Sequence, residues 1–148
     1  MEKESILSIE KAVQLRNLGV NMDDAALVSY LNKSETDQTG IVVTTLSSDF
    51  KDSDCCTLKH VYRYTLAELL NKLPINIEKW FLYIDQEEKA VYYSLDYYDE
   101  PEDALIYKKG DTLLDAVYVM YCWYLENEAS IRRRKKEFDS ELMSKLNL

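Results

Sequence analysis

The spacing of apolar residues near the N-terminus predicts a short helix. Apolar side chains recur at helical spacing, at Ile6, Ile9, Val13 and Leu18, so they lie on one face. Ser5 or Ser8 can cap the first turn, because a serine oxygen accepts a hydrogen bond from a backbone N–H group that the helix leaves unpaired. Gly19 follows the last apolar residue, and we expect it to end the helix.

Two strands are predicted next. Residues 26–31 alternate between two sets of side chains, and residues 41–45 form a β-branched run. A helix capped within residues 21–24 is the alternative for the first segment. We prefer a strand, so that polar residues 32–40 connect a β-hairpin. Residues 47–60 have no clear period and are predicted to form a surface loop.

The clearest helix start in the first half is a capping box. Thr65 is followed three residues later by Glu68, and in this motif each side chain accepts a hydrogen bond from the backbone N–H group of the other residue. The helix must end near Leu73, because Pro74 disfavours helical geometry in the residue before it.

Residues 80–85 and 89–97 predict a second hairpin, with a short third strand at residues 105–107. If Asp85 faces Ala90, the two strands carry apolar and aromatic side chains on both faces. Such a sheet needs a cover on each side or a partner. The register pairs Ile84 with Val91, Leu82 with Tyr93, Trp80 with Leu95, Tyr83 with Tyr92 and Phe81 with Ser94.

The last third of the chain predicts the strongest helix. Asp111 or Thr112 begins it, and residues 113–128 are apolar almost all round, so we expect this helix at the centre of the core. Beyond Ala129 the apolar residues are spaced as on an amphipathic helix, which is either a second helix or a continuation of the first. These residues are Ile131, Phe138, Leu142 and Leu146.

Together the elements predict an α+β fold. We expect an antiparallel sheet of about four to five strands packed against helices, with the central apolar helix at residues 113–128 and an amphipathic C-terminal helix. Residues 1–129 are expected to form a single domain, and residues 130–148 a charged helical extension of it.

Composition narrows the possible functions. The chain of 148 residues has a net charge of −9, three glycines, one histidine and 12 tyrosines. The acidic charge argues against general binding to nucleic acid or anionic membranes. The scarcity of glycine and histidine leaves no phosphate-binding loop and no histidine metal site. Tyrosine suits core edges and recognition surfaces, because its ring is apolar and its tip is polar.

Charge is unevenly distributed along the chain. Residues 1–129 hold 24 acids and 12 bases, whereas residues 130–148 hold 3 acids and 6 bases. Five of these bases are consecutive, at residues 132–136. We interpret them as a solvated helix face that complements the dipole at the end of the apolar helix, with Arg133–Glu137 and Lys135–Asp139 ion pairs. Contact with phosphates or an acidic partner is the alternative.

The cysteines offer one possible nucleophile. Catalysis by a thiol would need His60 beside Cys55, Cys56 or Cys122. Cys122 lies in the most apolar helix, where a buried thiol is the simpler interpretation. An odd cysteine count, with no signal sequence and no long apolar span, predicts a reduced protein of the cytoplasm.

Two acidic clusters could bind a hard cation or supply a general acid and base. Neither fits the calcium-loop template, so we interpret both as solvated loops and predict no metal site. The clusters are Asp49, Asp52 and Asp54, and Asp96, Asp99, Glu100, Glu102 and Asp103.

A resemblance rests on several segments between residues 60 and 128, which are residues 65–70, 73–74, 81–85, 111–116 and 120–123, with Glu126 and Asn127. Together these segments resemble small proteins carried by prophages and mobile elements of gut Bacteroidales. The resemblance implies a phage-related cytoplasmic protein, and it supplies no known activity.

The leading hypothesis is a non-enzymatic interaction protein that binds a protein partner or itself as a homodimer, with no catalytic residue, cofactor or metal. One alternative is an acidic effector that imitates nucleic acid and blocks a DNA-binding protein. Another is a hydrolase that uses carboxylates or a metal. The predicted interaction surface comprises Phe81, Tyr83, Tyr92, Tyr98, Ile131, Phe138, Leu142 and Leu146.

Overall fold

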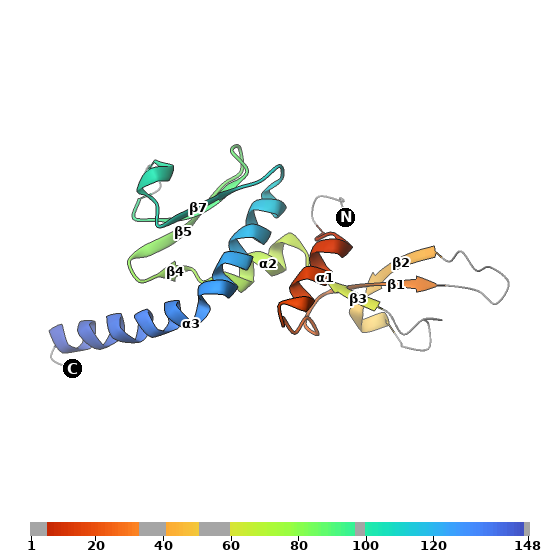
Figure 1. The fold of residues 1–148 in the computed structure, drawn as a ribbon, viewed down its shortest axis with the longest axis horizontal. Coiled ribbons are helices and arrows are strands. Elements are labelled where there is room, and N and C mark those ends of the chain that lie inside the picture. The colour runs from red at the N-terminus through yellow and green to blue at the C-terminus, as the bar shows by residue number, and fades with distance from the viewer. Residues whose placement is uncertain (1–5, 33–40, 51–59, 97–99, 147–148) are drawn as a thin grey trace. The chain divides into compact units, whose positions relative to one another are not determined.

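The chain folds into two compact units, Met1–Glu68 and Leu69–Leu148, in a computed structural model that describes residues 6–32, 41–50, 60–96 and 100–146 (Figure 1). Helices and antiparallel strands occur together, so the predicted α+β class is confirmed. The strands are divided between a three-stranded and a four-stranded sheet. A single domain over residues 1–129 with an extension at 130–148 stays a prediction, because it depends on whether the units unfold together.

The first unit pairs helix α1 with a three-stranded sheet in the order β2-β1-β3. Ser8 caps α1, since its Oγ accepts a hydrogen bond from the Lys11 N–H group at 3.2 Å. Gly19 follows the helix with a φ of +92°, a conformation that favours glycine. The elements are α1 (Ile9–Asn17), β1 (Leu27–Asn32), β2 (Ile41–Leu46), the 3-10 turn η2 (Ser47–Asp49) and β3 (His60–Arg63).

The predicted hairpin of the first unit is confirmed, and the helical alternative for residues 24–31 is wrong. β1 pairs antiparallel with both β2 and β3. Strand β3 was not predicted: only its first residue, His60, falls in the predicted loop, and residues 61–63 were assigned no element. All four residues of the strand are half-buried, so it carries no alternation that a pattern could reveal. Residues 51–59 of the predicted loop lie outside the described residues.

The capping box at Thr65 is confirmed and extends further than predicted. The Glu68 N–H group donates to Thr65 Oγ1 at 3.3 Å, and Glu68 Oε1 accepts from the Thr65 N–H group at 3.0 Å. Glu68 Oε2 also accepts from the Ala26 N–H group at 2.9 Å. One carboxylate therefore starts helix α2 (Leu66–Lys72) and also fixes the backbone that leads into β1.

The second unit contains the sheet β4-β5-β6-β7. The predicted hairpin register is confirmed at every pair from Phe81–Ser94 to Asp85–Ala90. Trp80 differs: β6 ends at Ser94, so the predicted pair with Leu95 is wrong, and Trp80 pairs with Ile77 of β4 instead. The elements are β4 (Asn76–Ile77), β5 (Trp80–Asp85), β6 (Ala90–Ser94), the 3-10 turn η4 (Pro101–Asp103) and β7 (Ile106–Lys109).

Helix α3 (Leu113–Lys145) is one continuous helix of 33 residues, so the continuation that we considered beyond Ala129 is the observed form. Its first half lies along β6 and β7 (Figure 1). There, 6.4 Å separates the ring centroids of Trp123 and Tyr93. Tyr93 is fully buried, and its hydroxyl donates to the Pro74 carbonyl oxygen at 2.8 Å. Burial raises the pKa of Tyr93, so this hydroxyl stays protonated and keeps its hydrogen bond.

The turn from β7 into α3 requires a glycine. A Cβ atom at Gly110 would lie 2.7 Å from both the Ala116 nitrogen and the Asp115 Cβ. Thr112 caps the helix directly afterwards, and its Oγ1 accepts from the Asp115 N–H group at 3.1 Å. The backbone of Gly110 therefore packs directly against the first turn of α3.

We predict that Gly110→Ala lowers the free energy of unfolding by about 1–3 kcal/mol, because the added methyl group overlaps rigid backbone. Gly19→Asn is the matched control, since nothing lies within 4 Å of a Cβ at Gly19 and asparagine tolerates positive φ. Urea denaturation would measure both variants. Equal losses would contradict the close approach at Gly110.

We predict that Glu68→Ala lowers the free energy of unfolding by about 1–2 kcal/mol, because it leaves the backbone N–H groups of Thr65 and Ala26 without their acceptor. Glu68→Gln retains one amide oxygen and should lose less. Urea denaturation of the two variants compares them. A loss as large for the glutamine as for the alanine would contradict the prediction, because it would show that the retained oxygen restores neither hydrogen bond.

Candidate interaction surface

Three tyrosines form a row across the four-stranded sheet. The strand register places Tyr83, Tyr92 and Tyr107 side by side on β5, β6 and β7. Their rings stack in sequence, with 5.6 Å between centroids in each pair. Neighbouring residues of a strand point to opposite faces, so this tyrosine row lies on the face opposite Tyr93 and therefore opposite α3.

The ends of this outer face differ in chemistry. Phe81, which lies on the same face two residues before Tyr83, has 49% of its surface exposed. At the other end Lys109 forms an ion pair with Glu88, with 3.0 Å between Nζ and Oε2. The hydrogen bond that the Lys109 ammonium donates to the Glu88 carboxylate raises the pKa of Lys109. The outer face is therefore aromatic at one end and charged at the other.

The predicted aromatic residues are only partly brought together. Phe81, Tyr83 and Tyr92 share the outer face, whereas Tyr98 lies outside the described residues. Tyr107 was not predicted as a site residue. The strand at 105–107 was expected, but pairing it with the hairpin would have been needed to find its position in the row.

A second surface follows the far half of α3. The residues Ile131, Phe138, Leu142 and Leu146, which we name the tail stripe, recur at intervals that keep them on one helical face. Ile131 is half-buried, and Phe138, Leu142 and Leu146 are 38%, 46% and 57% exposed. Met120, three turns before Ile131, belongs to the same face and is fully buried. The core-facing side of α3 thus continues into solvent-exposed residues.

The basic residues of the tail are arranged differently from our prediction. Arg132 forms an ion pair with Glu128 at 2.6 Å, and Arg134 forms one with Glu78 at 2.7 Å. The predicted pairs Arg133–Glu137 and Lys135–Asp139 are not formed. The explanation by the helix dipole is also wrong, because α3 continues to Lys145 and the dipole acts mainly within the last turn.

A groove of about 410 Å³ lies between α3 and the segment that contains β4. Ile131, Lys135 and Phe138 line it from the helix, and residues 74–78 line it from the other side. Ile75 is 79% exposed at this groove. The groove therefore adjoins the tail stripe on the side of the sheet edge.

The thiol arrangement receives no support from the described residues. His60 lies in a series of ring contacts with Phe50 and Tyr62, at 5.0 and 5.3 Å between centroids. Cys55 and Cys56 lie outside the described residues, and Cys122 is half-buried in α3. His60 also lines a pocket of about 340 Å³ with Arg16, whose Nη1 donates to the His60 carbonyl oxygen at 3.3 Å.

The acidic clusters are only partly described. Asp49 lies in η2, while Asp52 and Asp54 fall outside the described residues. Asp96, Glu100, Glu102 and Asp103 are exposed, and Asp99 falls outside. Within the described ranges, no three His, Cys, Asp or Glu side chains are grouped so that they could hold a metal ion.

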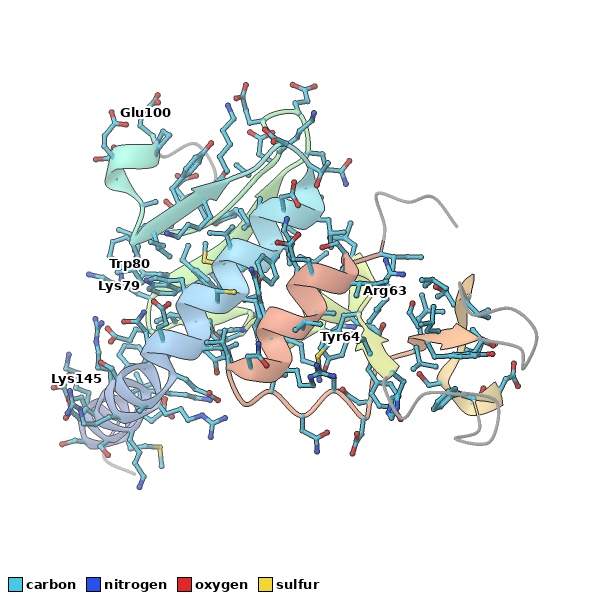
Figure 2. All side chains as sticks on the ribbon, turned by 45° about the vertical axis from the view of Figure 1, so that its right-hand side comes forward. Arg63, Tyr64, Lys79, Trp80, Glu100 and Lys145 are labelled. Atoms are coloured by element: carbon cyan, nitrogen blue, oxygen red, sulfur yellow. The ribbon has the colours of Figure 1, made fainter. Side chains whose placement is uncertain are left out.

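Arg63 is a structurally important residue that the sequence patterns did not single out. The Nε of Arg63, which is labelled in Figure 2, donates to the Leu7 carbonyl oxygen at 2.8 Å, and its Nη1 donates to Ser29 Oγ at 3.1 Å. Ser29 and Thr44 hydroxyls are 2.7 Å apart beside it. Burial lowers the pKa of Arg63. These contacts connect all three strands of the first sheet to the segment before α1.

Comparison with known proteins adds no assignment: no protein-family model, curated protein or solved structure matches the chain. The resemblance to prophage and mobile-element proteins therefore stays a prediction. Among the helices that the structure describes, none combines the length and the apolar character needed to cross a membrane.

We predict that residues of the outer face differ in how much they contribute to the free energy of unfolding. Tyr92 is 6% exposed, so Tyr92→Ala should lower the free energy of unfolding by about 2–4 kcal/mol. Phe81→Ala should cost less than about 1 kcal/mol, because half of that ring already contacts solvent. Thermal and urea denaturation measure both. A larger loss at Phe81 than at Tyr92 would contradict the described burial.

Proposed function

We propose that this protein is a non-enzymatic interaction protein that self-associates, with the tail stripe as its main contact. The observation that carries the proposal is the continuity of one helical face. The face is buried at Met120 and then exposed at Phe138, Leu142 and Leu146. An amphipathic helix with an exposed apolar stripe is expected to bury it against another surface.

Apolar burial supplies free energy for association. Burial of apolar surface contributes about 25 cal/mol per Å², so a leucine or phenylalanine that is fully buried contributes about 1.5–3 kcal/mol. Phe138, Leu142 and Leu146 are already about half covered, so each contributes about half of that amount and together they offset part of the association cost of about 4–15 kcal/mol. A second copy supplies the same stripe, as an isologous two-fold interface requires.

The tyrosine row is proposed as a second contact surface for a protein partner. Its rings are held by stacking at 5.6 Å, so little rotamer entropy is lost when they are covered. We place this accessory role in the cytoplasm, in keeping with an odd cysteine count. A phage or mobile-element setting follows only from the resemblance.

We predict that the full chain is a dimer, and that Leu142→Gln combined with Leu146→Gln weakens the dimer at least about tenfold. The change removes apolar burial while glutamine maintains helix propensity. Sedimentation or light scattering over a concentration series measures the dissociation constant. Added salt should change it little, because apolar burial supplies most of the affinity.

The matched control is Leu18→Gln combined with Leu95→Gln. These leucines are about as exposed as Leu142 and Leu146 but lie outside the tail stripe, so the control should retain the dimer. A monomer at all concentrations, or equal weakening in both variants, would contradict the proposal. A partner lost steeply with salt would favour the nucleic-acid mimic instead.

A further inference from the structure

We propose that two copies pair through antiparallel α3 tails, with the two-fold axis between Lys136 and Glu137. This inference rests on the proposed self-association and adds the partner's orientation. Two independent features carry it, which are the order of charges along the tail and the position of the groove beside Ile131.

The exposed tail carries its charges in two blocks. Residues 132–136 are all basic, and the block that follows is acidic at three positions, Glu137, Asp139 and Glu141. All of these side chains are exposed. Phe138 lies close to the boundary between the blocks, near the middle of the tail stripe.

The two orientations differ in their electrostatics. In a parallel pair, each block lies beside the same block of the other chain, so five bases face five bases. In an antiparallel pair centred between Lys136 and Glu137, residues 132, 134 and 136 face residues 141, 139 and 137, so each basic block faces the partner's acidic block. Like charges across a helix pair are destabilising and opposite charges are stabilising, so charge selects the antiparallel orientation.

Most of the charged side chains on which this antiparallel pairing depends form no ion pair within their own chain, among the described residues. Arg132 and Arg134 are held by Glu128 and Glu78 of their own chain. The remaining bases and the acids form no ion pair within the described residues. They are Arg133, Lys135, Lys136, Glu137, Asp139 and Glu141.

The groove gives a second, geometric reason. At 1.5 Å per residue, Ile131 lies about 8 Å before the two-fold axis and Leu142 about 8 Å after it. An antiparallel partner therefore places its exposed Leu142 level with Ile131, and its Leu146 lies about one turn further along. The groove of about 410 Å³ opens there, with Ile75 exposed beside it. This orientation pairs the most exposed leucines with the least covered part of the body.

The C-terminal end of the tail is exposed, as docking of its leucines at the partner's groove requires. Figure 2 views the last turns of α3, around Lys145, nearly along the helix axis, and side chains radiate from it on all sides. Residues 132–146 are exposed throughout. The last turns are therefore accessible to a second chain.

The orientation is tested with a charge-swapped full chain. The variant exchanges the two blocks but leaves Arg132 and Arg134 unchanged, so their ion pairs within the chain are retained. It carries Arg133→Glu, Lys135→Glu, Lys136→Glu, Glu137→Lys, Asp139→Lys and Glu141→Lys.

The swapped chain alone should dimerise as the wild type does, because its blocks remain complementary. Mixed at low ionic strength, the two proteins should sort into homodimers, with heterodimers at least about threefold below their statistical share. Native mass spectrometry with an isotope-labelled partner measures the fractions. Labelled and unlabelled wild type, mixed as a control, should reach the statistical share.

Each outcome decides a separate claim. Heterodimers at or above the statistical share would overturn the antiparallel orientation while leaving self-association intact. Monomers of the wild type at every concentration would overturn the proposed function itself. Capture of a different protein by a monomeric chain would assign the tail stripe to that partner and overturn both.

A second measurement does not depend on the swapped variant folding. Ile131→Cys and Leu142→Cys introduce thiols on the tail stripe, at two positions that the antiparallel pair places level with each other. Antiparallel pairing predicts a disulfide between one variant and the other when they are mixed, identified by peptide mapping. Disulfides that join each variant to itself would indicate parallel pairing and overturn the inference.

Discussion

The alternation of side chains along β6 is the constraint on which much of the second unit depends. Tyr93 is fully buried, its ring contacts Trp123 of α3, and its hydroxyl is bonded to Pro74. Because adjacent residues in a strand face opposite ways, fixing Tyr93 inward fixes Tyr92 outward. The outer face therefore has to carry aromatic rings, and it stabilises them by stacking Tyr92 between Tyr83 and Tyr107.

A similar continuity governs α3. A helix cannot change the residues on one face where its supporting sheet ends, so the spacing that buries Met120 also aligns the tail stripe. The tail is joined to the body on one side by the ion pair between Arg134 and Glu78. An exposed ion pair contributes about 0–1 kcal/mol, which is small beside the apolar area that the tail leaves uncovered. The tail's position is thus set mainly by the continuity of the helix.

Local signals in the sequence were sufficient for part of this fold. The capping box at Thr65 and the register of β5 with β6 depend on neighbouring residues, and both were predicted correctly. The division into two sheets depends on contacts between distant segments, and β3 has no alternating burial to reveal it. The role of Arg63 was missed for the same reason, because its acceptors on Leu7 and Ser29 are remote in sequence. At the candidate surface, Tyr107 could be placed in the tyrosine row only by knowing that β7 pairs with β6, and the periodicity of the sequence does not show which strands pair.

The two candidate surfaces differ in how much they need a partner. In the tyrosine row the central ring is already covered by its neighbours. Most of this surface is therefore stable within one chain, and its proposed role is to bind a partner rather than to be covered by one. In the tail stripe the exposed fraction rises from Phe138 to Leu146, and within the described residues nothing covers the last turns. Apolar burial at the tail therefore supplies the driving force for association, while the charge blocks beside it contribute little affinity and mainly determine which orientation forms.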